Sequence, residues 1–421
     1  MLNQGWRPGL ALLAAFGVVS LAAVPGPAGA AVRQARQESG EFAGAAAADG
    51  IRDNQQWVLD MLNAETAWSV TRGSGVTVAV IDSGVDPDVS DLEGSVITGP
   101  DYTGVNTSSA SQNWGVHGTW MASLIAGHGH DGGLSGVIGI APEARILSIR
   151  AIPDRSDPHY GKYEREPETV IQQSLANGIA YAVAHGARVI SMSIGYSAPS
   201  GTVRNELQKA YDRGVVVIAS AGNSGGPAAG HGGEAPESFP ANYPGVISVG
   251  AVKPSGAVAG FSSDNLSVQV AAPGVSVPAQ GRDGQYWWVS GTSPACALVA
   301  GVAALIESRY PGLAPDLVAT ALTSTTTDRP AAGYDSQVGF GIVDAAAALA
   351  KAGELAGARP AEASLKATAK YRGVLPQEPV LPRGSGQLVL FALLALTSLA
   401  LTAAAVTQLA VLRRSPGRAN R

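Results

Sequence analysis

The segment from Ser290 to Ile306 constrains the fold more than any other part of the chain. It opens with Ser-Gly-Thr-Ser-Pro and continues as an uncharged apolar run from Ala295 to Ile306. A helix that is apolar on every side is buried, so this run predicts a central helix inside a large core. Ser293 suits the N-cap and Pro294 the first helical position, where a missing N–H costs nothing. The Ser293 hydroxyl would then lie where helix-terminal N–H groups favour negative charge, although Ser-Pro is also simply a common helix start.

Runs of β-branched residues alternate with helical apolar spacing through the middle of the chain. The segments expected to form strands are 76–81, 146–149, 189–195 and 215–219, and those expected to form helices are 169–185 and 203–213. Strands that alternate with helices at this spacing predict a parallel sheet. We therefore expect an α/β fold of three layers, with a mostly parallel central sheet and helices on both faces.

Three polar residues stand at the ends of these elements. Asp82 directly follows the first strand, His117 precedes an apolar helical run, and Asn223 follows the strand at 215–219. Open α/β sheets place their ligand sites at the carboxyl ends of the strands. Each residue also has a simpler interpretation, because Asp and Asn are typical turn residues and a histidine at a helix start can be structural.

Together with Ser293, these residues follow the order Asp, His, Ser that is found in subtilisin. The surrounding motifs are Val-Ile-Asp82-Ser-Gly, His117-Gly-Thr, Gly139-Ile-Ala-Pro142, Ser191-Met-Ser-Ile-Gly195, Ser220-Ala-Gly-Asn223 and Gly291-Thr-Ser293. On these motifs the chain resembles the subtilisin-like serine protease family over residues 53–349. The resemblance implies the subtilisin-like form of the three-layer fold and peptide-bond hydrolysis through an acyl-enzyme.

The resemblance also implies a role for each matching residue. Ser293 is expected to be the nucleophile, His117 the general base and then acid, and Asp82 the residue that orients the imidazole. Asn223 is expected to bind the oxyanion together with the backbone N–H of Ser293. The substrate is expected to pair as an added strand with the backbone of Ser193, Ile194, Gly195, Ala219, Ser220, Ala221 and Gly222.

The chain departs from the family pattern at three positions beside these motifs. Trp120 stands where the family usually has a second histidine, and Ala297 where it usually has a proline. Pro294 directly follows the serine, and a proline disfavours helical backbone at the residue before it, so this departure bears on the geometry of Ser293.

Composition excludes several other classes of function. A net charge of −5 argues against nucleic-acid binding. The single cysteine, Cys296, excludes an intrachain disulfide and a cysteine-based zinc site. We expect His128 and His130 to be solvated on a glycine-rich loop, and Asp86, Asp88 and Asp91 to form a turn without the spacing of a calcium loop. Neither a cofactor nor a metal is therefore expected.

The two ends of the chain predict a secreted body with a membrane anchor. An apolar run ending in Ala28-Gly29-Ala30 fits a signal peptide, and Leu388 to Leu412 carries no charge over more than the roughly 20 residues that cross a bilayer. The arginines that follow place the C-terminus in the cytoplasm and the body outside the cell membrane. The expected divisions are a signal peptide at 1–30, an N-terminal extension at 31–55, a peptidase domain at 56–352, a Pro/Ala-rich linker at 353–386, a transmembrane helix at 387–412 and a cytoplasmic tail at 413–421.

Within the family, the chain is most similar to mycosins, the membrane-anchored subtilisin-like proteases of type VII secretion. The similarity rests on Trp57 and Trp68 before the first strand, a lead-in too short for a self-folding pro-domain, and the linker, anchor and Arg-rich tail. It implies protein or peptide substrates and secretion-machinery partners, although mycosins often carry disulfides that this chain cannot form. Two alternatives stay open: a scaffold subunit whose protease site is secondary or silent, and a general degradative protease of the cell surface.

Overall fold

The computed structural model describes residues 44–46, 50–225, 235–357, 397–398 and 407 of the 421-residue chain. The chain divides into two units, Met1–Ala358 and Arg359–Arg421. The predicted signal peptide at 1–30 lies outside the described residues, as does the transmembrane segment at 387–412 apart from Thr397, Ser398 and Thr407. Among the helices that the structure describes, none has both the length and the apolar character to cross a bilayer.

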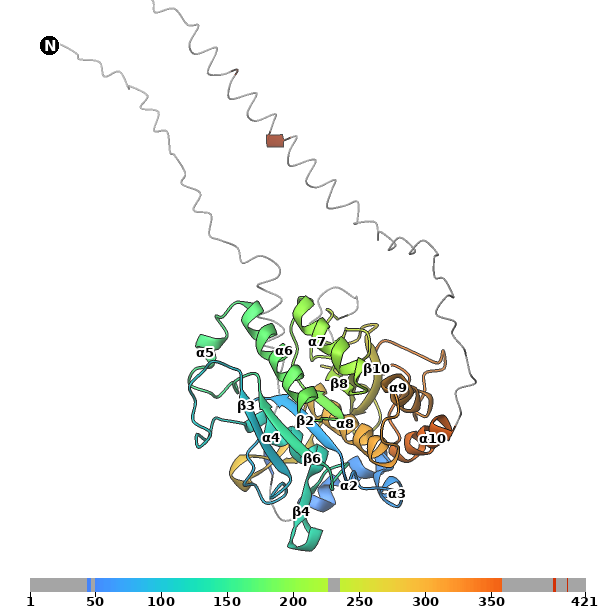
Figure 1. The fold of residues 1–421 in the computed structure, drawn as a ribbon. Helices are drawn as coiled ribbons and strands as arrows, with labels where there is room; N and C mark the ends of the chain where they lie inside the picture. The colour runs from blue at the N-terminus through green and yellow to red at the C-terminus, as the bar shows by residue number, and fades with distance from the viewer. Residues whose placement is uncertain (1–43, 47–49, 226–234, 358–396, 399–406, 408–421) are drawn as a thin grey trace, which may run out of the picture. The chain divides into compact units, whose positions relative to one another are not determined.

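A sheet of seven strands forms the middle layer of the first unit, as far as its described residues show. In spatial order the strands are β10 (Val268–Pro273), β9 (Val246–Val252), β8 (Val216–Ser220), β7 (Val189–Met192), β2 (Thr77–Asp82), β6 (Arg145–Arg150) and β3 (Val96–Asp101). All the neighbouring strands are parallel (Figure 1). The strand order reverses between β2 and β7, and the carboxyl ends at such a point are where α/β sheets bind ligands.

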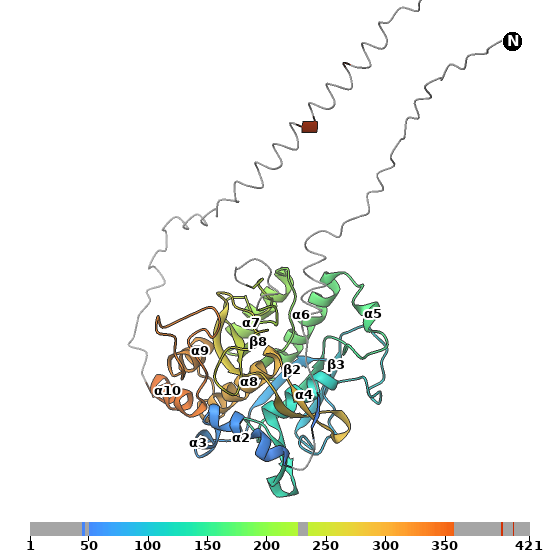
Figure 2. The same ribbon diagram turned by 180° about the vertical axis from the view of Figure 1, so that it is seen from behind.

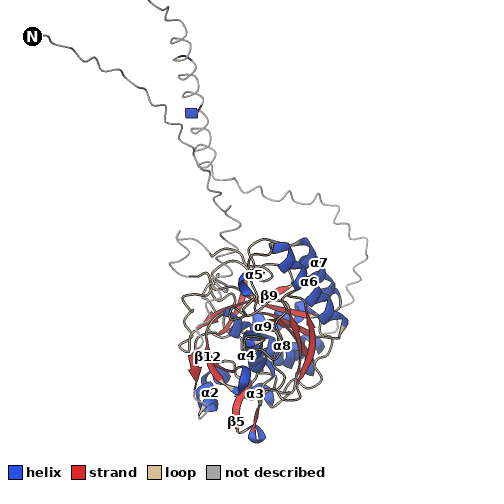
Figure 3. Cartoon of the chain, turned by 90° about the vertical axis from the view of Figure 1, so that its left-hand side faces the viewer, coloured by secondary structure: helices blue, strands red, loops and turns tan. Residues whose placement is uncertain are grey.

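Helices cover both faces of this sheet (Figure 3). Those that pack on one face are α4 (Val116–Ala126) and α8 (Thr292–Arg309). Those that pack on the other are α6 (Glu168–Ala184) and α7 (Gly201–Asp212). The strands β7 and β8 are buried at every position, as expected for a parallel sheet covered on both sides. The predicted α/β architecture with a parallel central sheet is confirmed.

Helix α8 is buried from Thr292 through Glu307, as its uninterrupted apolar sequence predicts. It begins one residue before Ser293, so the prediction that Ser293 is the N-cap is wrong. Gly291 is the cap residue, and Ser293 lies inside the first turn. The helix continues through Pro294 because a proline in the first turn lacks an N–H that would have no intrahelical acceptor.

The remaining elements lie around this core. The strands are β1 (Gly44–Ala46), β4 (His128–His130), β5 (Ser135–Ile138), β11 (Val277–Gln280) and β12 (Tyr286–Val289). The helices are α2 (Ile51–Met61), α3 (Ala64–Trp68), α5 (Tyr160–Tyr163), α9 (Pro315–Ser324) and α10 (Ala345–Gly357). Strand β12 pairs with β11 on one side and with β1 on the other.

The segment before β2 packs onto this body, as its aromatic and aliphatic residues predict. Helix α3 contacts α10, and both lie near α2 in the view from behind (Figure 2). Arg52 of α2 donates hydrogen bonds to the backbone carbonyls of Gly133, Ser135 and Gly136. Gln55 exchanges two hydrogen bonds with the backbone of Ile138. The α2 helix is therefore held to the β4–β5 hairpin by directed polar contacts as well as by burial.

Replacing Arg52 tests this attachment. We expect Arg52→Ala to lower the free energy of unfolding by about 2 kcal/mol, because three carbonyls lose a charged donor. Lys351→Ala, which removes an exposed ion pair with Glu354, should cost less than about 0.5 kcal/mol. Urea unfolding of both variants, followed by tryptophan fluorescence, measures the difference. Equal losses would show that the Arg52 contacts contribute nothing specific.

Candidate active site

Asp82 and His117 come together at the carboxyl end of β2. Asp82 is the last residue of that strand and is 1% exposed, while His117 is the second residue of α4. The His117 Nδ1 atom lies 2.6 Å from Asp82 Oδ1. An ionised carboxylate only accepts hydrogen bonds, so this contact assigns the proton to Nδ1 and leaves Nε2 as the basic nitrogen.

Asn223 meets the start of α8, three residues after the end of β8. Its Oδ1 accepts hydrogen bonds from the Thr292 backbone N–H at 2.8 Å and from Thr292 Oγ1 at 2.9 Å. The Asn223 side chain therefore caps the first turn of α8, which explains why the helix starts before Ser293. Because both bonds use Oδ1, the Asn223 NH₂ group is not part of them.

Ser293 is the second residue of α8, so its backbone N–H belongs to the positive end of a buried helix. Ser193 Oγ donates to the Ser293 carbonyl oxygen at 3.2 Å, which ties the loop after β7 to the serine. Ser293 is 3% exposed. The Gly222 N–H in turn donates to Thr292 Oγ1 at 3.2 Å. The structure therefore gathers the predicted residues after β7 and β8 around the first turn of α8.

A cavity of about 560 Å³ adjoins His117. The predicted substrate-binding residues Ser193, Ile194 and Gly195 line it together with His117. Of the other predicted substrate-binding residues, Ala219 and Ser220 lie in β8 and Ala221 follows them as a buried residue. The cavity gives an extended ligand access to the histidine and to the loop that contacts Ser293.

Two tryptophans form part of the wall of this cavity. Trp120 lies with its ring centroid 6.2 Å from that of His117 and 5.8 Å from that of Trp287. Trp120 occupies the position at which subtilisin-like proteases usually have a second histidine. Its indole packs edge-on against the imidazole at an interplanar angle of 72°, which restricts the ring orientation of His117.

The one cysteine of the chain is fully buried in α8 beside the site. Its Sγ lies 3.7 Å from Ser191 Oγ and 3.8 Å from the Met192 carbonyl oxygen. Burial raises the pKa of the Cys296 thiol to about 11. A thiol that stays protonated at neutral pH is a poor nucleophile, so Cys296 is a small core residue.

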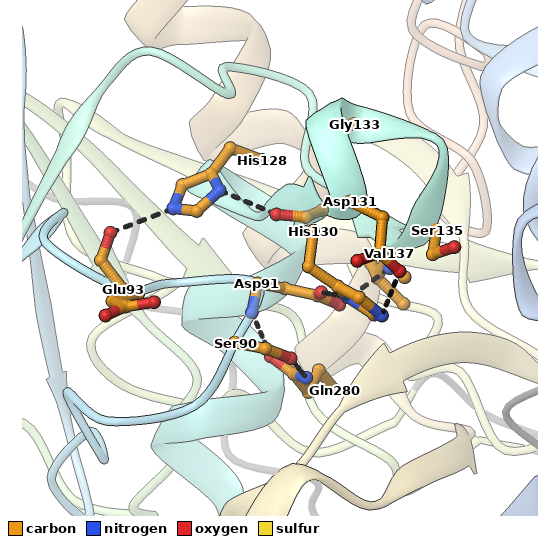
Figure 4. Close-up of polar contacts among 12 residues, drawn as sticks. Ser90, Asp91, Glu93, His128, His130, Asp131, Gly133, Ser135, Val137 and Gln280 are labelled. Carbon is orange, nitrogen blue, oxygen red and sulfur yellow. Dashed lines mark hydrogen bonds and ion pairs between the residues drawn. The ribbon is translucent and has the colours of Figure 1, made fainter.

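The histidines of the β4 strand are held by the protein, contrary to the expectation that they are solvated (Figure 4). His130 Nδ1 lies 2.7 Å from Asp91 Oδ1, and Asp91 Oδ2 accepts from the Val137 N–H. Tyr286 also donates to Asp91, and burial followed by the Asp91 charge raises the pKa of its phenol. Within the part of the chain that the structure describes, no three His, Cys, Asp or Glu residues are arranged to hold a metal ion.

Two further residues of this site were not among those predicted from the sequence. Thr292 positions Asn223, and Asp154 binds the backbone of the first turn of α4. The loop at 153–167 is rich in charged residues, which favours exposure to solvent, yet Asp154 and Asp157 are only 5% and 4% exposed. Asp157 is buried because Arg150 pairs with it at 2.8 Å. The one available signal was position, since Asp154 lies in the loop after the carboxyl end of β6, but that position alone does not reveal its contacts.

Comparison with known proteins agrees with this geometry. The subtilase family profile matches residues 73–341. A thermophilic serine proteinase of Bacillus sp. (strain AK1) is 37% identical over 58% of this chain and 55% of its own length. The chain spans about half of the length of several such curated relatives.

Two solved structures share the fold over 70% of this chain. MycP1 from the ESX-1 type VII secretion system is 30% identical, with a TM-score of 0.58 and 85% of its chain covered. The MycP3 protease from the ESX-3 type VII secretion system is 31% identical, with a TM-score of 0.57 and 87% of its chain covered. The parallel sheet, the sequence motifs and these similarities lead to one conclusion: the chain belongs to the subtilase family.

Proposed function

We propose that this protein is a serine endopeptidase that cleaves peptide bonds through an acyl-enzyme. Ser293 attacks the scissile carbonyl, and His117 Nε2 takes its proton and later gives it to the leaving amine. Asp82 fixes the tautomer of His117 and stabilises the imidazolium that forms. The observation that carries the proposal is the 2.6 Å contact between Asp82 and His117. It is made beside a cavity lined by Ser193, whose hydroxyl donates to the Ser293 carbonyl.

The oxyanion of the tetrahedral intermediate is bound by Asn223 Nδ2 and by the backbone N–H of Ser293. The fixed position of Asn223 Oδ1 on Thr292 supports this assignment, because a donor held rigid before the reaction needs no reorganisation during it. The bound substrate runs along the backbone of residues 193–195 and 219–222 as an added strand, with its side chains entering the cavity.

Shortening Asn223 tests the oxyanion assignment. We expect Asn223→Ala to lower kcat by about 10²- to 10³-fold with little change in KM, since the lost bond forms only in the transition state. Steady-state kinetics on a peptide substrate measures both constants. Gln208→Ala, an exposed side chain on α7, is the matched amide control and should keep wild-type kinetics. A rise in KM at constant kcat would instead assign Asn223 to ground-state binding.

The activity itself is tested with the full-length protein purified in detergent. Incubation with a peptide library and mass spectrometry of the products should reveal cleavage at internal bonds, which a fluorophosphonate abolishes. Insensitivity to the fluorophosphonate, or removal of terminal residues alone, would contradict the assignment as a serine endopeptidase.

We further propose that the protease acts outside the cell membrane, held by the segment at 387–412 and associated with type VII secretion. The likeness to MycP1 and MycP3 over 70% of the chain supports the association, and the signal-like and anchor-like segments of the sequence support the topology. Complementation of a deletion strain separates the alternatives. Secretion restored by Ser293→Ala would favour the scaffold, and secretion restored by a chain that ends before residue 387 would contradict the need for an anchor.

A further inference from the structure

The first turn of α4, which carries His117, has no cap of its own. The residue before the helix is Gly115, with φ of 72° and no side chain to accept a hydrogen bond. The helix start also lies close to Gly84, whose carbonyl oxygen would be 2.1 Å from a Cβ at position 118. The first N–H groups of a helix have no intrahelical acceptor, so those of Val116, His117 and Gly118 need acceptors from other elements.

Asp154 and Ser83 supply these acceptors. The Val116 N–H donates to Asp154 Oδ2 at 2.9 Å, and the His117 N–H donates to Asp154 Oδ1 at 2.9 Å. The Gly118 N–H donates to Ser83 Oγ at 3.0 Å, and the Ser83 hydroxyl also hydrogen-bonds with the Asp154 carboxylate. One buried carboxylate therefore bridges two consecutive N–H groups, one of which belongs to His117 itself.

We propose that Asp154 is a positioning residue for His117: it holds the backbone of the histidine while Asp82 holds the ring, and its negative charge favours the imidazolium. This inference rests on the proposed function, because it assigns His117 the role of general base. Two carboxylates then act on one histidine from different elements, Asp82 from the end of β2 and Asp154 from the loop after β6.

The surroundings make the charge of Asp154 sensitive to pH. Burial raises the pKa of Asp154 to about 6. The hydrogen bonds from the His117 and Val116 N–H groups, the charge of His117 and the hydrogen bond with Ser83 act in the opposite direction and lower it. Three other charged groups lie around this contact. Asp82 on β2 binds the ring of the same histidine, Arg150 on β6 donates to the Ser83 carbonyl, and Arg282 lines the same cavity as Asp154. Above this pKa the carboxylate is ionised and both N–H bonds are intact. Below it the carboxyl gains a proton, and the support for imidazolium weakens.

Histidine NMR tests the proposal without any assumption about activity. In full-length protein labelled with ¹³C-histidine, the His117 resonance is the one lost in His117→Gln. We expect Asp154→Asn to lower the pKa of His117 by about one unit, because a nearby negative charge is removed. Asp154→Glu, which keeps the charge, should retain the wild-type value. Ser200 caps α7 through the same kind of contact, a side-chain oxygen that accepts from a backbone N–H. Ser200→Ala removes that cap and should leave the pKa of His117 unchanged.

Kinetics and a measurement on the unaltered protein complete the test. Asp154→Asn should lower kcat about 10- to 100-fold with little effect on KM, since a displaced base misses the reacting proton. Should that variant not fold, the backbone ¹⁵N shift of Val116 in the wild type should still titrate near pH 6. A folded Asp154→Asn with an unchanged His117 pKa would overturn the proposal, and so would a wild-type Val116 amide whose ¹⁵N shift shows no titration step at acid pH. If only the endopeptidase assignment is wrong, the wild type will be inactive while the NMR results are as predicted here.

Discussion

Ser293→Ala is expected to lower kcat by about 10⁶-fold while the protein remains folded. The substitution removes only the hydroxyl oxygen of a residue in the first turn of α8, and an alanine suits a buried helix. The remaining catalysis would come from the oxyanion donors and from substrate binding. Steady-state cleavage of a fluorogenic peptide measures the loss, and far-UV circular dichroism with the Tm confirms the fold.

A serine from the same helix provides the matched control. Ser308 lies near the other end of α8 and donates a hydrogen bond to the Ser74 carbonyl. Ser308→Ala should retain the wild-type kcat. Activity that survives in purified Ser293→Ala above a trace of contaminating wild-type enzyme would identify another nucleophile.

Asp82→Asn should lower kcat by about 10⁴-fold. An asparagine fits the same space, but its NH₂ group can donate to His117 Nδ1, which stabilises the tautomer with the proton on Nε2. That tautomer cannot accept the proton of Ser293. The loss should appear in kcat rather than in KM, because the substrate-binding loops do not change.

The pH dependence of kcat/KM distinguishes the loss of this interaction with His117 from a general loss of folded protein. Asp82 favours the imidazolium, so its removal should shift the acid limb of the kcat/KM profile to lower pH. Asp212→Asn, at an exposed aspartate that accepts a bond from Gln208, should change neither the rate nor the profile. An Asp82→Asn enzyme with wild-type kcat would show that the 2.6 Å contact does not orient a catalytic base.

The sequence was informative about the architecture where a strand is covered on both sides. The strands β2, β7 and β8 are nearly continuous apolar runs, and β6 has a β-rich centre between two arginines, so their existence and the parallel sheet were predictable. Three other strands of the sheet, β3, β9 and β10, were not predicted. Strand β3 is partly exposed and contains Gly99 and Pro100, which weakens its strand signal. The limits of the elements also differ from the prediction, as at the start of helix α8 and at the end of strand β7.

The site was predictable to the extent that its residues occur in local motifs. Asp82, His117, Asn223 and Ser293 each stand at the end of an element, and that position could be inferred from the pattern of apolar runs. The part played by Asp154 could not be inferred, because its contacts join the end of β6 to the start of α4. Its surrounding sequence is charged, and only the fold shows that the carboxylate is buried.

Mass spectrometry of the protein after treatment with a fluorophosphonate tests the central claim most directly. A serine activated by the Asp82–His117 pair should carry one adduct on the peptide that contains Ser293. The adduct should be absent from Ser293→Ala and should form far more slowly in Asp82→Asn. An adduct on another residue, or a folded wild type that takes no label, would contradict the assignment of Asp82, His117 and Ser293 to one catalytic unit.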